Sequence, residues 1–361
     1  MILNRFVMRE ISRSMLAVGA VLIAIFASYD AASYLADAVS GLLPSSFILL
    51  FLALKTGIAL EVLLPTTLYV AVVVSLGRMY RDCEMIALES CGVGMRHVFK
   101  PVFYFSFVVA VVVAVISLYV RPWSYEKIYR LKAQARSNFD ISQMKGGQFY
   151  EIEYANLVIF AEKVEPSKNR GEQVFVSIQD EEKQKVIFAQ RAYQRTVELS
   201  GKQLLLLING HMYEFTPDGQ ESKITEFQKA SYIISPKNDL AQRYRRKAAS
   251  TQHLASSDSL EDIAEFQWRL STPLSAVLLG LLGALLSHTS PRQGKYAKVM
   301  LAVVVFAVYY NISVVAKNWV EKGAVAPFPG IWWVQVLLAL VIIVLAWRQH
   351  IFFIGRLRST G

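Results

Sequence analysis

Apolar residues along this chain gather in long runs, and polar residues gather between the runs. The long runs lie at 15–34, within 47–76, at 102–120, at 272–286, at 299–316 and at 332–347. A helix of about 20 apolar residues crosses the hydrocarbon core of a bilayer, which is roughly 30 Å thick. The pattern therefore predicts an integral, α-helical membrane protein with six transmembrane helices.

Between the third and fourth runs, from 121 to 265, no window is apolar enough to span a membrane. Short alternating segments replace the long runs: GQFYEIEY, NLVIFAE, VFVSIQD, KVIFAQ, QLLLLING and HMYEFT. Such segments, rich in Val, Ile, Phe and Tyr and separated by turn residues, predict an all-β domain of the sandwich, barrel or jelly-roll type. Its interior is either an ordinary filled core or a cavity open to a lipid, and the alternation does not separate the two.

The chain therefore divides into three blocks. Residues 1–120 hold spans one to three and the connector at 77–98, residues 121–265 hold the β domain and its linker, and residues 266–361 hold spans four to six. The linker is the polar stretch 236–258. Ser259 follows it as a helix N-cap, with Asp262 three positions later as in a capping box.

Lysine and arginine are distributed unequally between the two sides that six spans define. One side has almost none in its short loops: 38–46 has none, and 319–330 has Lys322 alone. By the positive-inside rule the side rich in these residues is cytosolic. We therefore expect both termini in the cytosol and the β domain outside. The residues that define the cytosolic side are Arg5, Arg9, Arg13, Arg78, Arg81, Arg96, Lys100, Arg292, Lys295, Lys298, Arg348, Arg356 and Arg358.

Composition agrees with a membrane protein and excludes several classes of function. Of 361 residues 54% are hydrophobic and only 18% are charged, and the mean hydropathy is +0.36. The net charge of +10 is explained by the flanks of the spans, because no nucleic-acid motif accompanies it. The chain has no G-x-x-x-x-G-K-[ST] loop, no H-E-x-x-H and no G-x-S-x-G. We expect neither an enzyme nor a bound cofactor or metal, so energy for any transport must come from a partner.

The connector between spans two and three, residues 77–100, is longer and more charged than a connector needs to be. Its sequence, GRMYRDCEMIALESCGVGMRHVFK, predicts a short amphipathic helix that ends at Gly92 and Gly94. An acidic cytosolic helix of this kind suits a groove on a soluble ATPase. We take Glu84 as the central contact, beside Asp82 and Arg81, because a carboxylate pairs well with arginine. The residues alone leave open an internal charge network of Glu84 with Arg81.

Both cysteines, Cys83 and Cys91, lie in this connector, and in the cytosol both are expected to be reduced. Their spacing matches no zinc pattern. We expect them to pack within the connector helix.

Lys317 stands at the outer end of span five, where positive charge is otherwise sparse. It could attract a phosphate-bearing substrate at headgroup depth, or it could simply snorkel to lipid phosphates. Asp30 and Asp37 lie at the outer end of span one. Lys55 and Glu61 interrupt span two, and with Asp30 they are too few for the dense polar site that an ion-coupled transporter needs. A sensor whose β domain binds an envelope ligand remains an alternative function.

Four motifs together resemble one family. The segments GRMYRDCEMIALESCGVG, FQWRLSTPLS, SPRQGKYAK and GIWWVQ resemble those of the lipopolysaccharide-export permeases, the LptF/LptG family of Gram-negative bacteria. The resemblance covers the whole chain in order. It is strongest at 77–94 and 266–298, and weakest in the β insert.

The resemblance implies a subunit of an ATP-driven ABC transporter in the bacterial inner membrane. A permease of this family pairs with a second permease of the LptG type, an LptB-type ATPase dimer and a single-span LptC-type protein. Lipopolysaccharide would leave the outer leaflet and pass through a periplasmic β-jellyroll to LptC and the periplasmic bridge. Glu84 matches the coupling glutamate, and Lys317 matches a basic residue at the mouth of the substrate cavity. Leu285 stands where the family suggests proline, and Gln335 where it suggests histidine.

Overall fold

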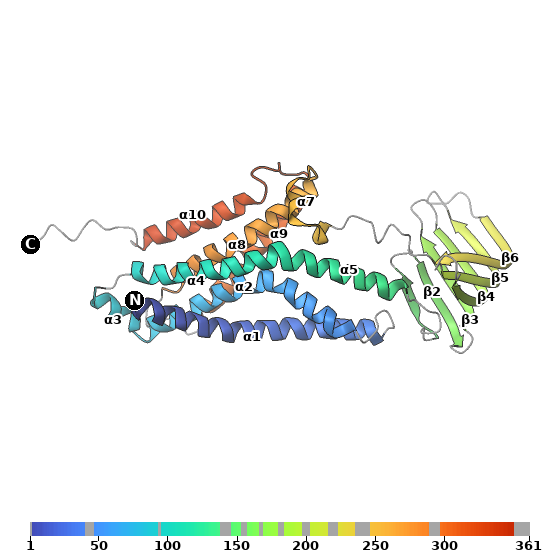
Figure 1. Ribbon diagram of the computed structural model, residues 1–361, viewed down its shortest axis with the longest axis horizontal. Helices are drawn as coiled ribbons and strands as arrows, with labels where there is room; N and C mark the ends of the chain where they lie inside the picture. The colour runs from blue at the N-terminus through green and yellow to red at the C-terminus, as the bar shows by residue number, and fades with distance from the viewer. Residues whose placement is uncertain are drawn as a thin grey trace, which may run out of the picture. The chain divides into compact units, whose positions relative to one another are not determined.

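The computed structural model describes residues 2–39, 47–92, 95–137, 146–152, 157–165, 169–179, 184–196, 203–215, 223–234, 246–288 and 297–349. The chain forms two compact units. The first is helical and consists of Met1–Tyr34, Ile48–Ile128 and Arg245–Gly361. The second consists of Leu35–Phe47 and Tyr129–Tyr244 and holds a β-sheet (Figure 1).

Within the described residues, five helical segments are long and apolar enough to cross a membrane, and a shorter apolar helix, α10, follows them. The membrane-protein class predicted from the apolar runs is thus confirmed. The helices are α1 Ile2–Val39, α2 Ile48–Arg81, α4 Met95–Val115 continued by α5 Arg121–Ser137, α8 Leu260–Leu286, α9 Ala297–Glu321 and α10 Trp332–Arg348. Two short helices join them, α3 Glu84–Ser90 and α7 Thr251–Ala255.

The helices extend well beyond the apolar runs that predict them. Helix α1 has 38 residues, about 57 Å at 1.5 Å per residue. The basic N-terminal segment and the first span therefore form one helix. Arg5, Arg9 and Arg13 lie exposed along one side, as their spacing predicts, while Val7 and Ile11 are fully buried on another.

Helical backbone also continues past the predicted end of span three. A π-helical turn, Ile116–Val120, joins α4 directly to α5. The sequence of α5, RPWSYEKIYRLKAQARS, is polar, and for that reason the hydropathy pattern ends span three at 120. Proline near its start and residues such as Leu, Lys, Ala and Gln favour a helix nonetheless.

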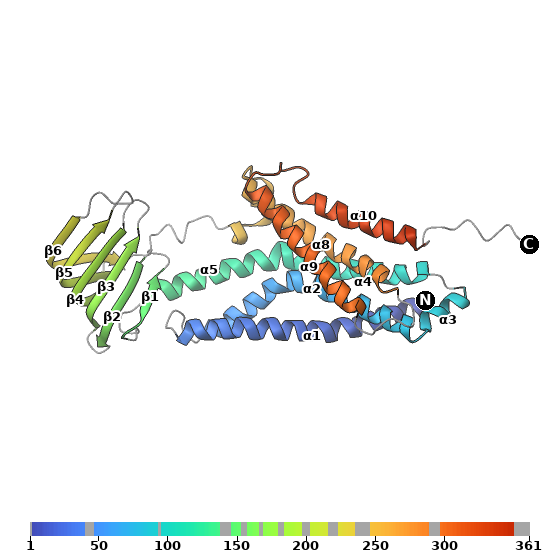
Figure 2. The same ribbon diagram turned by 180° about the vertical axis from the view of Figure 1, so that it is seen from behind.

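The β domain contains one antiparallel sheet with the strands in chain order, as Figure 2 shows. Among the described strands each pairs with its sequence neighbour, which is a meander. The predicted segments QLLLLING and HMYEFT form one strand, β5, and the segment KITEFQKASYII forms a strand that the pattern did not predict, β6. The strands are β1 Phe149–Ile152, β2 Leu157–Glu165, β3 Arg170–Gln179, β4 Gln184–Thr196, β5 Gln203–Phe215 and β6 Lys223–Ile234.

A kink crosses the sheet and explains why β5 looks like two strands in the sequence. Buried residues alternate with period two, but the step is three between Gly171 and Val174 in β3, and again between Leu207 and Gly210 in β5. Strand β4 makes the same step after Ala189. At the kink Gln173 and Asn209 have positive φ, 49° and 50°. Because β3, β4 and β5 each have this step in the same row, the pairing register of β3 with β4 and of β4 with β5 is the same on both sides of the kink.

Helix α8 is central to the helical unit and packs against α2, α4, α9 and α10. A Cβ at Gly280 would lie 2.1 Å from Ser106 Oγ of α4, so glycine permits this close approach. Leu285 is 1% exposed and belongs to the apolar core near the end of α8. The helix continues unbroken past it to Leu286, so leucine in place of the family's proline leaves the end of span four helical.

Candidate functional site

The predicted coupling residues lie where α2 ends and α3 begins. Arg81 and Asp82 form an ion pair at 3.3 Å, and Asp82 lies 4.0 Å from Arg78. Glu84 is the first residue of α3. One of its carboxylate oxygens has no hydrogen-bond partner, and no ion pair joins Glu84 to Arg81 within the described part of the chain. Among the described residues of the connector, the ion pairs therefore involve Asp82 and not Glu84.

Helix α3 packs against the bundle by apolar contacts, and an ion pair joins α1 to the end of α2 close by. Met85 is 1% exposed and packs in a cluster with Val7 and Ile11 of α1. Arg78 Nη2 lies 2.9 Å from Glu10 Oε1, which adds a second connection between α1 and the end of α2. The amphipathic prediction is thus correct for Met85.

The prediction that the two cysteines pack within the connector helix is wrong, because Cys83 and Cys91 are both exposed within this chain. Helix α3 ends at Ser90, before Cys91 could join the buried face. Gly92 follows with a φ of 79°, a conformation that suits glycine after a helix. The second predicted cytosolic loop, with Arg292 and Lys295, and the side chains of Glu89, Arg96, Lys298 and Asp37 lie outside the described residues.

A cluster of buried charges joins three helices, α2, α5 and α8, at another place in the helical unit. Arg121 Nη1 donates to both carboxylate oxygens of Glu61, at 2.8 and 2.9 Å, and Arg121 Nη2 lies 2.9 Å from Glu265 Oε1. Arg269 Nε lies 3.4 Å from the same Glu265 oxygen. All four residues are at most 5% exposed. The negative charges of two carboxylates therefore balance the positive charges of two guanidinium groups in the interior. We call these four residues the four-charge cluster.

The π-helical turn between α4 and α5 brings two side chains to this cluster. Ser117 Oγ donates to Glu61 Oε1 at 2.8 Å, and Arg121 follows four residues later. Thr272 Oγ1 of α8 also donates to this carboxylate oxygen, at 3.4 Å. A π-helical turn costs local hydrogen-bond geometry and occurs often at functional sites. Here both of its inward polar groups contact Glu61.

Arg269 also binds the segment through which the chain returns from the β domain. Its guanidinium donates to the main-chain oxygens of Ala249 at 3.0 Å and Lys247 at 3.2 Å. The hydroxyl of Thr251 accepts another of these donors at 3.2 Å, and Thr251 in turn donates to the main chain at Leu118. The outgoing helix and the returning segment are therefore fastened to the same buried cluster.

Lys317 of α9 contacts this cluster from its edge. Its ammonium lies 2.6 Å from Glu265 Oε2 and 3.7 Å from Glu321, and 5.2 Å from the centre of the Trp268 ring. Its side chain is 15% exposed. Lys317 thus has a protein carboxylate as its partner in this conformation, and any anion that binds it must compete with Glu265.

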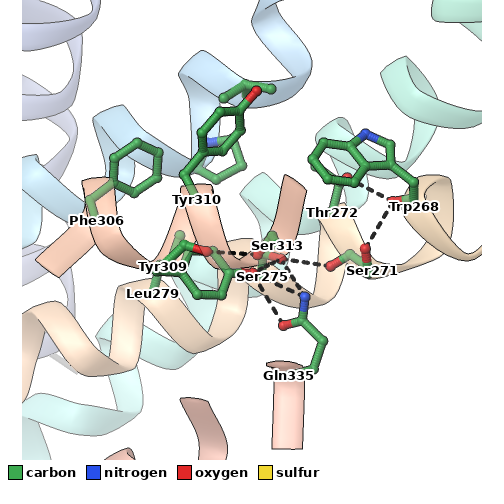
Figure 3. A pocket seen from close by; sticks show the side chains of 12 residues that line it. Trp268, Ser271, Thr272, Ser275, Leu279, Phe306, Tyr309, Tyr310, Ser313 and Gln335 are labelled. Carbon is green, nitrogen blue, oxygen red and sulfur yellow. Dashed lines mark hydrogen bonds between the residues drawn. The ribbon is translucent and has the colours of Figure 1, made fainter. Parts of the chain in front are cut away.

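A small cavity with hydroxyl and amide groups in a largely apolar lining lies between α2, α8, α9 and α10 (Figure 3). Gln335 Nε2 donates to Ser275 Oγ at 3.1 Å and to the Tyr309 hydroxyl at 3.0 Å, and the two hydroxyls lie 2.5 Å apart. The cavity measures about 30 Å³, enough for one or two water molecules. Through these hydrogen bonds Gln335 joins α10 to α8 and α9.

The sequence did not single out Arg121, Glu265 and Arg269, and it treated Glu61 as an interruption of an apolar helix. In the sequence they are recognisable only as ionisable residues close to apolar spans, and such residues usually have a function. Their pairing joins residues far apart in the chain, which a single sequence does not reveal. The structure also places Glu61 in a denser polar site than the sequence predicted. Lys317 belongs to this cluster, whereas Arg81, Asp82 and Glu84 lie elsewhere, where α2 ends and α3 begins.

Together, several membrane-length helices and an antiparallel β domain define a multi-pass membrane protein. The family model of the lipopolysaccharide export system permease LptF/LptG matches residues 5–348, and the chain belongs to this family. It is 25% identical over 351 residues to the lipopolysaccharide export system permease protein LptF of Escherichia coli strain K12, an alignment that covers 96% of this chain and 95% of that protein. The LptF protein of Shigella flexneri matches with the same identity and coverage. The chain is thus an inner-membrane permease subunit of lipopolysaccharide export.

Proposed function

We propose that this chain is one of two permeases in an ATP-driven ABC transporter that extracts lipopolysaccharide from the outer leaflet of the inner membrane. A second permease of the LptG type forms the other half of the substrate cavity, and an LptC-type protein joins them. The β domain lies in the periplasm and passes the lipid onward to the periplasmic bridge. Membership of the LptF/LptG family supports each of these assignments.

The observation that carries the proposal is the position of Glu84. It begins a short helix between two membrane-length helices, and its carboxylate forms no ion pair with the described residues of its own chain. One oxygen of this carboxylate is buried and has no hydrogen-bond partner among the described residues, so an arginine or lysine of a partner that reached it would satisfy it. An LptB-type ATPase dimer that binds α3 would pass its motion to α1 and α2 through Met85 and the Glu10–Arg78 ion pair.

Reconstitution with the partner subunits in lipid vesicles tests the function directly. We expect lipopolysaccharide to be released to a periplasmic acceptor only when ATP is hydrolysed. Hydrolysis that continues with no release of lipopolysaccharide would overturn the proposal.

Replacing Glu84 tests the coupling site. Glu84→Ala should weaken association of the ATPase about 10- to 100-fold, because a charge-assisted hydrogen bond contributes about 1.5–3 kcal/mol. Membrane insertion should be unchanged. Association is measured by titrating the purified ATPase onto the permease pair.

The matched control is Cys83→Ser, which alters the neighbouring exposed residue without removing a charge. It should bind the ATPase as the unmodified chain does. If Glu84→Ala also retained full association and transport, Glu84 would have no coupling role.

A further inference from the structure

A row of aromatic side chains crosses the β-sheet on the face opposite its buried apolar cluster. Cross-strand pairing puts one phenylalanine of each of four neighbouring strands in register: Phe149, Phe160, Phe175 and Phe188. The ring centres of Phe149 and Phe160 lie 4.7 Å apart, and those of Phe175 and Phe188 lie 5.0 Å apart. In β4 both neighbours of Phe188 are buried in the cluster. Because successive side chains of a strand alternate between faces, the row lies on the other face.

The aromatic row is open to solvent. Phe149 is 67% exposed and Phe188 is 49% exposed. A contiguous apolar patch of this kind, beside polar residues, usually marks a binding surface. The register continues from Phe188 to His211 of β5 and Glu226 of β6, so the row ends in two polar residues.

A row of amide side chains runs parallel to the aromatic row, at the kink of the sheet. The pairs on either side of the kink place four exposed residues of β3 to β6 opposite one another: Gln173, Gln190, Asn209 and Gln228. An amide side chain carries two N–H donors and one carbonyl acceptor. The row therefore presents donors and acceptors at each strand, with the strands about 4.8 Å apart.

The two rows line one groove, which measures about 1020 Å³. Val174, Ala189 and Gly210 lie in the row between them and also line it. A Cβ at Gly210 would lie 2.1 Å from the main-chain oxygen of Phe188, so this close approach of β4 and β5 requires glycine. The kink that separates the two rows is thus built into the sequence.

The groove holds one of its amides in an unfavourable backbone conformation. Gln173 has a φ of 49°, and glutamine seldom adopts this left-handed region. Residues held in such a conformation concentrate at ligand-binding sites. Among the described residues that line the groove there is no lysine or arginine, and its ionisable residues are His211 and Glu226. This composition does not suit an anionic ligand.

We propose that the groove binds an uncharged glycan, a chain of pyranose sugars. The C–H groups on one face of a pyranose ring pack against the negative face of an aromatic ring. Sugar hydroxyls both donate and accept hydrogen bonds, as the amide row does. Strand β3 offers Phe175 with Gln173, and β4 offers Phe188 with Gln190. The same pair of groups therefore recurs from strand to strand, which fits a ligand made of repeated units.

This site goes beyond the proposed transport function, because binding of a glycan needs neither ATP nor a partner subunit. In the periplasm, where that function places the β domain, an uncharged sugar chain has two sources. One is the glycan of the cell wall, and the other is the saccharide of lipopolysaccharide. The shared chemistry is the pyranose chain, and the two sources are separated by experiment.

The test uses the full chain in nanodiscs that are free of sugar-based detergent. Calorimetry measures the affinity for N-acetylglucosamine oligomers and for lipid-free oligosaccharide from lipopolysaccharide. We expect binding that does not weaken when salt is raised, because salt screens only charges. Tighter binding of N-acetylglucosamine oligomers assigns the glycan to the cell wall, and tighter binding of the other saccharide assigns it to the transported lipid. Binding of neither saccharide would overturn the site.

Single variants test the two rows separately. Phe188→Ala should weaken binding about 10-fold, as expected for the loss of one aromatic stacking contact, and Phe188→Trp should retain it. Gln190→Ala should weaken binding about threefold to tenfold, the effect of one neutral hydrogen bond. The matched control is Phe215→Ala, because Phe215 is a 42% exposed phenylalanine of β5 outside the groove lining. Equal affinities of the Phe188→Ala and Phe215→Ala chains would contradict the proposal.

Photo-crosslinking identifies the occupant in cells without relying on a loss of binding. A photoreactive phenylalanine analogue at position 149, the most exposed ring of the row, should yield saccharide adducts detected by mass spectrometry. Adducts with protein alone would assign this face to a protein partner and end the glycan proposal. If the saccharides bound while ATP-driven release of lipopolysaccharide failed, the groove would stand and the proposed function would fall. If release proceeded and neither saccharide bound, the reverse would hold.

Discussion

At the scale of single residues, the carboxylate of Glu265 contacts three cationic side chains from three helices. One oxygen faces Arg121 and Arg269, and the other faces Lys317. Glu265 is fully buried, so these contacts replace the water that a carboxylate would otherwise hold. A buried network of this kind is stable only when every charge has a partner, which makes the loss of one member costly.

Removing Arg121 tests this dependence. Arg121→Gln should destabilise the chain by about 3–5 kcal/mol, because Glu61 loses its bidentate partner in the interior. Thermal unfolding of the detergent-purified chain measures the change. The exposed-site variant Lys322→Gln should unfold as the unmodified chain does.

The double variant Arg121→Gln/Glu61→Gln separates an unpaired charge from lost packing. It should be more stable than Arg121→Gln alone, because it removes the buried carboxylate that the single variant leaves without its partner. If the double variant were the less stable of the two, the ion pair would not be the source of the effect.

The sequence predicts single charged residues better than it predicts their partners. Glu84 and Lys317 stand out because they lie in conspicuous places, a charged connector and the end of a span. The partner of Lys317 is Glu265, which lies in the first turns of α8, a part of the helix that hydropathy places outside the fourth span. The pairing depends on how α8 and α9 pack, and that information is not local in sequence.

At the scale of elements, the close contact of α8 with α4 depends on a residue without a side chain. A Cβ at Gly280 would lie 3.0 Å from Ser106 Cβ as well as 2.1 Å from its hydroxyl oxygen. Ser106 is fully buried and cannot turn into solvent. Membrane helices pack by such small residues, since lipid supplies little hydrophobic force between them.

Two glycine substitutions should therefore have opposite effects. Gly280→Ala should destabilise the chain by about 1–3 kcal/mol, the usual cost of overpacking. Gly77→Ala, also within a helix but with no atom within 4 Å of the added Cβ, should stabilise it by up to about 1 kcal/mol. Thermal unfolding in detergent compares them, and equal shifts would show that α4 and α8 are not in close contact.

The sequence predicts the type of an element wherever its hydrophobic pattern extends over the whole helix or strand. It does not predict where the helix or strand begins and ends. The apolar runs identify α2 and α9, whereas α5 is hidden because a polar helix carries no hydropathy signal. Strand β6 was missed because KITEFQKASYII has polar and charged residues among its apolar ones. Strand β5 was divided because its alternation shifts by one residue at Asn209.

At the scale of the whole molecule, the distribution of lysine and arginine predicts which side of the membrane each loop occupies. The exposed thiols of Cys83 and Cys91 provide a direct probe of that prediction. A membrane-impermeant maleimide should label both in inverted membrane vesicles and neither in intact spheroplasts. Labelling is measured by the mass shift of the purified chain.

A cysteine placed in the β domain gives the complementary control. Ser231→Cys, at an exposed position of β6, in a chain that lacks Cys83 and Cys91, should be labelled in spheroplasts and protected in inverted vesicles. The same labelling pattern for the connector cysteines and for Ser231→Cys would place the connector and the β domain on one side and contradict the orientation.

The kink in the sheet also limits how this β domain can change over evolutionary time. In β3, β4 and β5 one extra residue separates two buried positions, and it lies in the same row of the sheet in all three strands. The buried residues of the three strands therefore stay on the same face. A single deletion between Gly210 and the end of β5 would turn the remaining residues of that strand to the opposite face while its neighbours stayed in place. A change in the length of one strand alone is therefore expected to destabilise the sheet. Length differences among related β domains should accumulate in the turns and not within the strands.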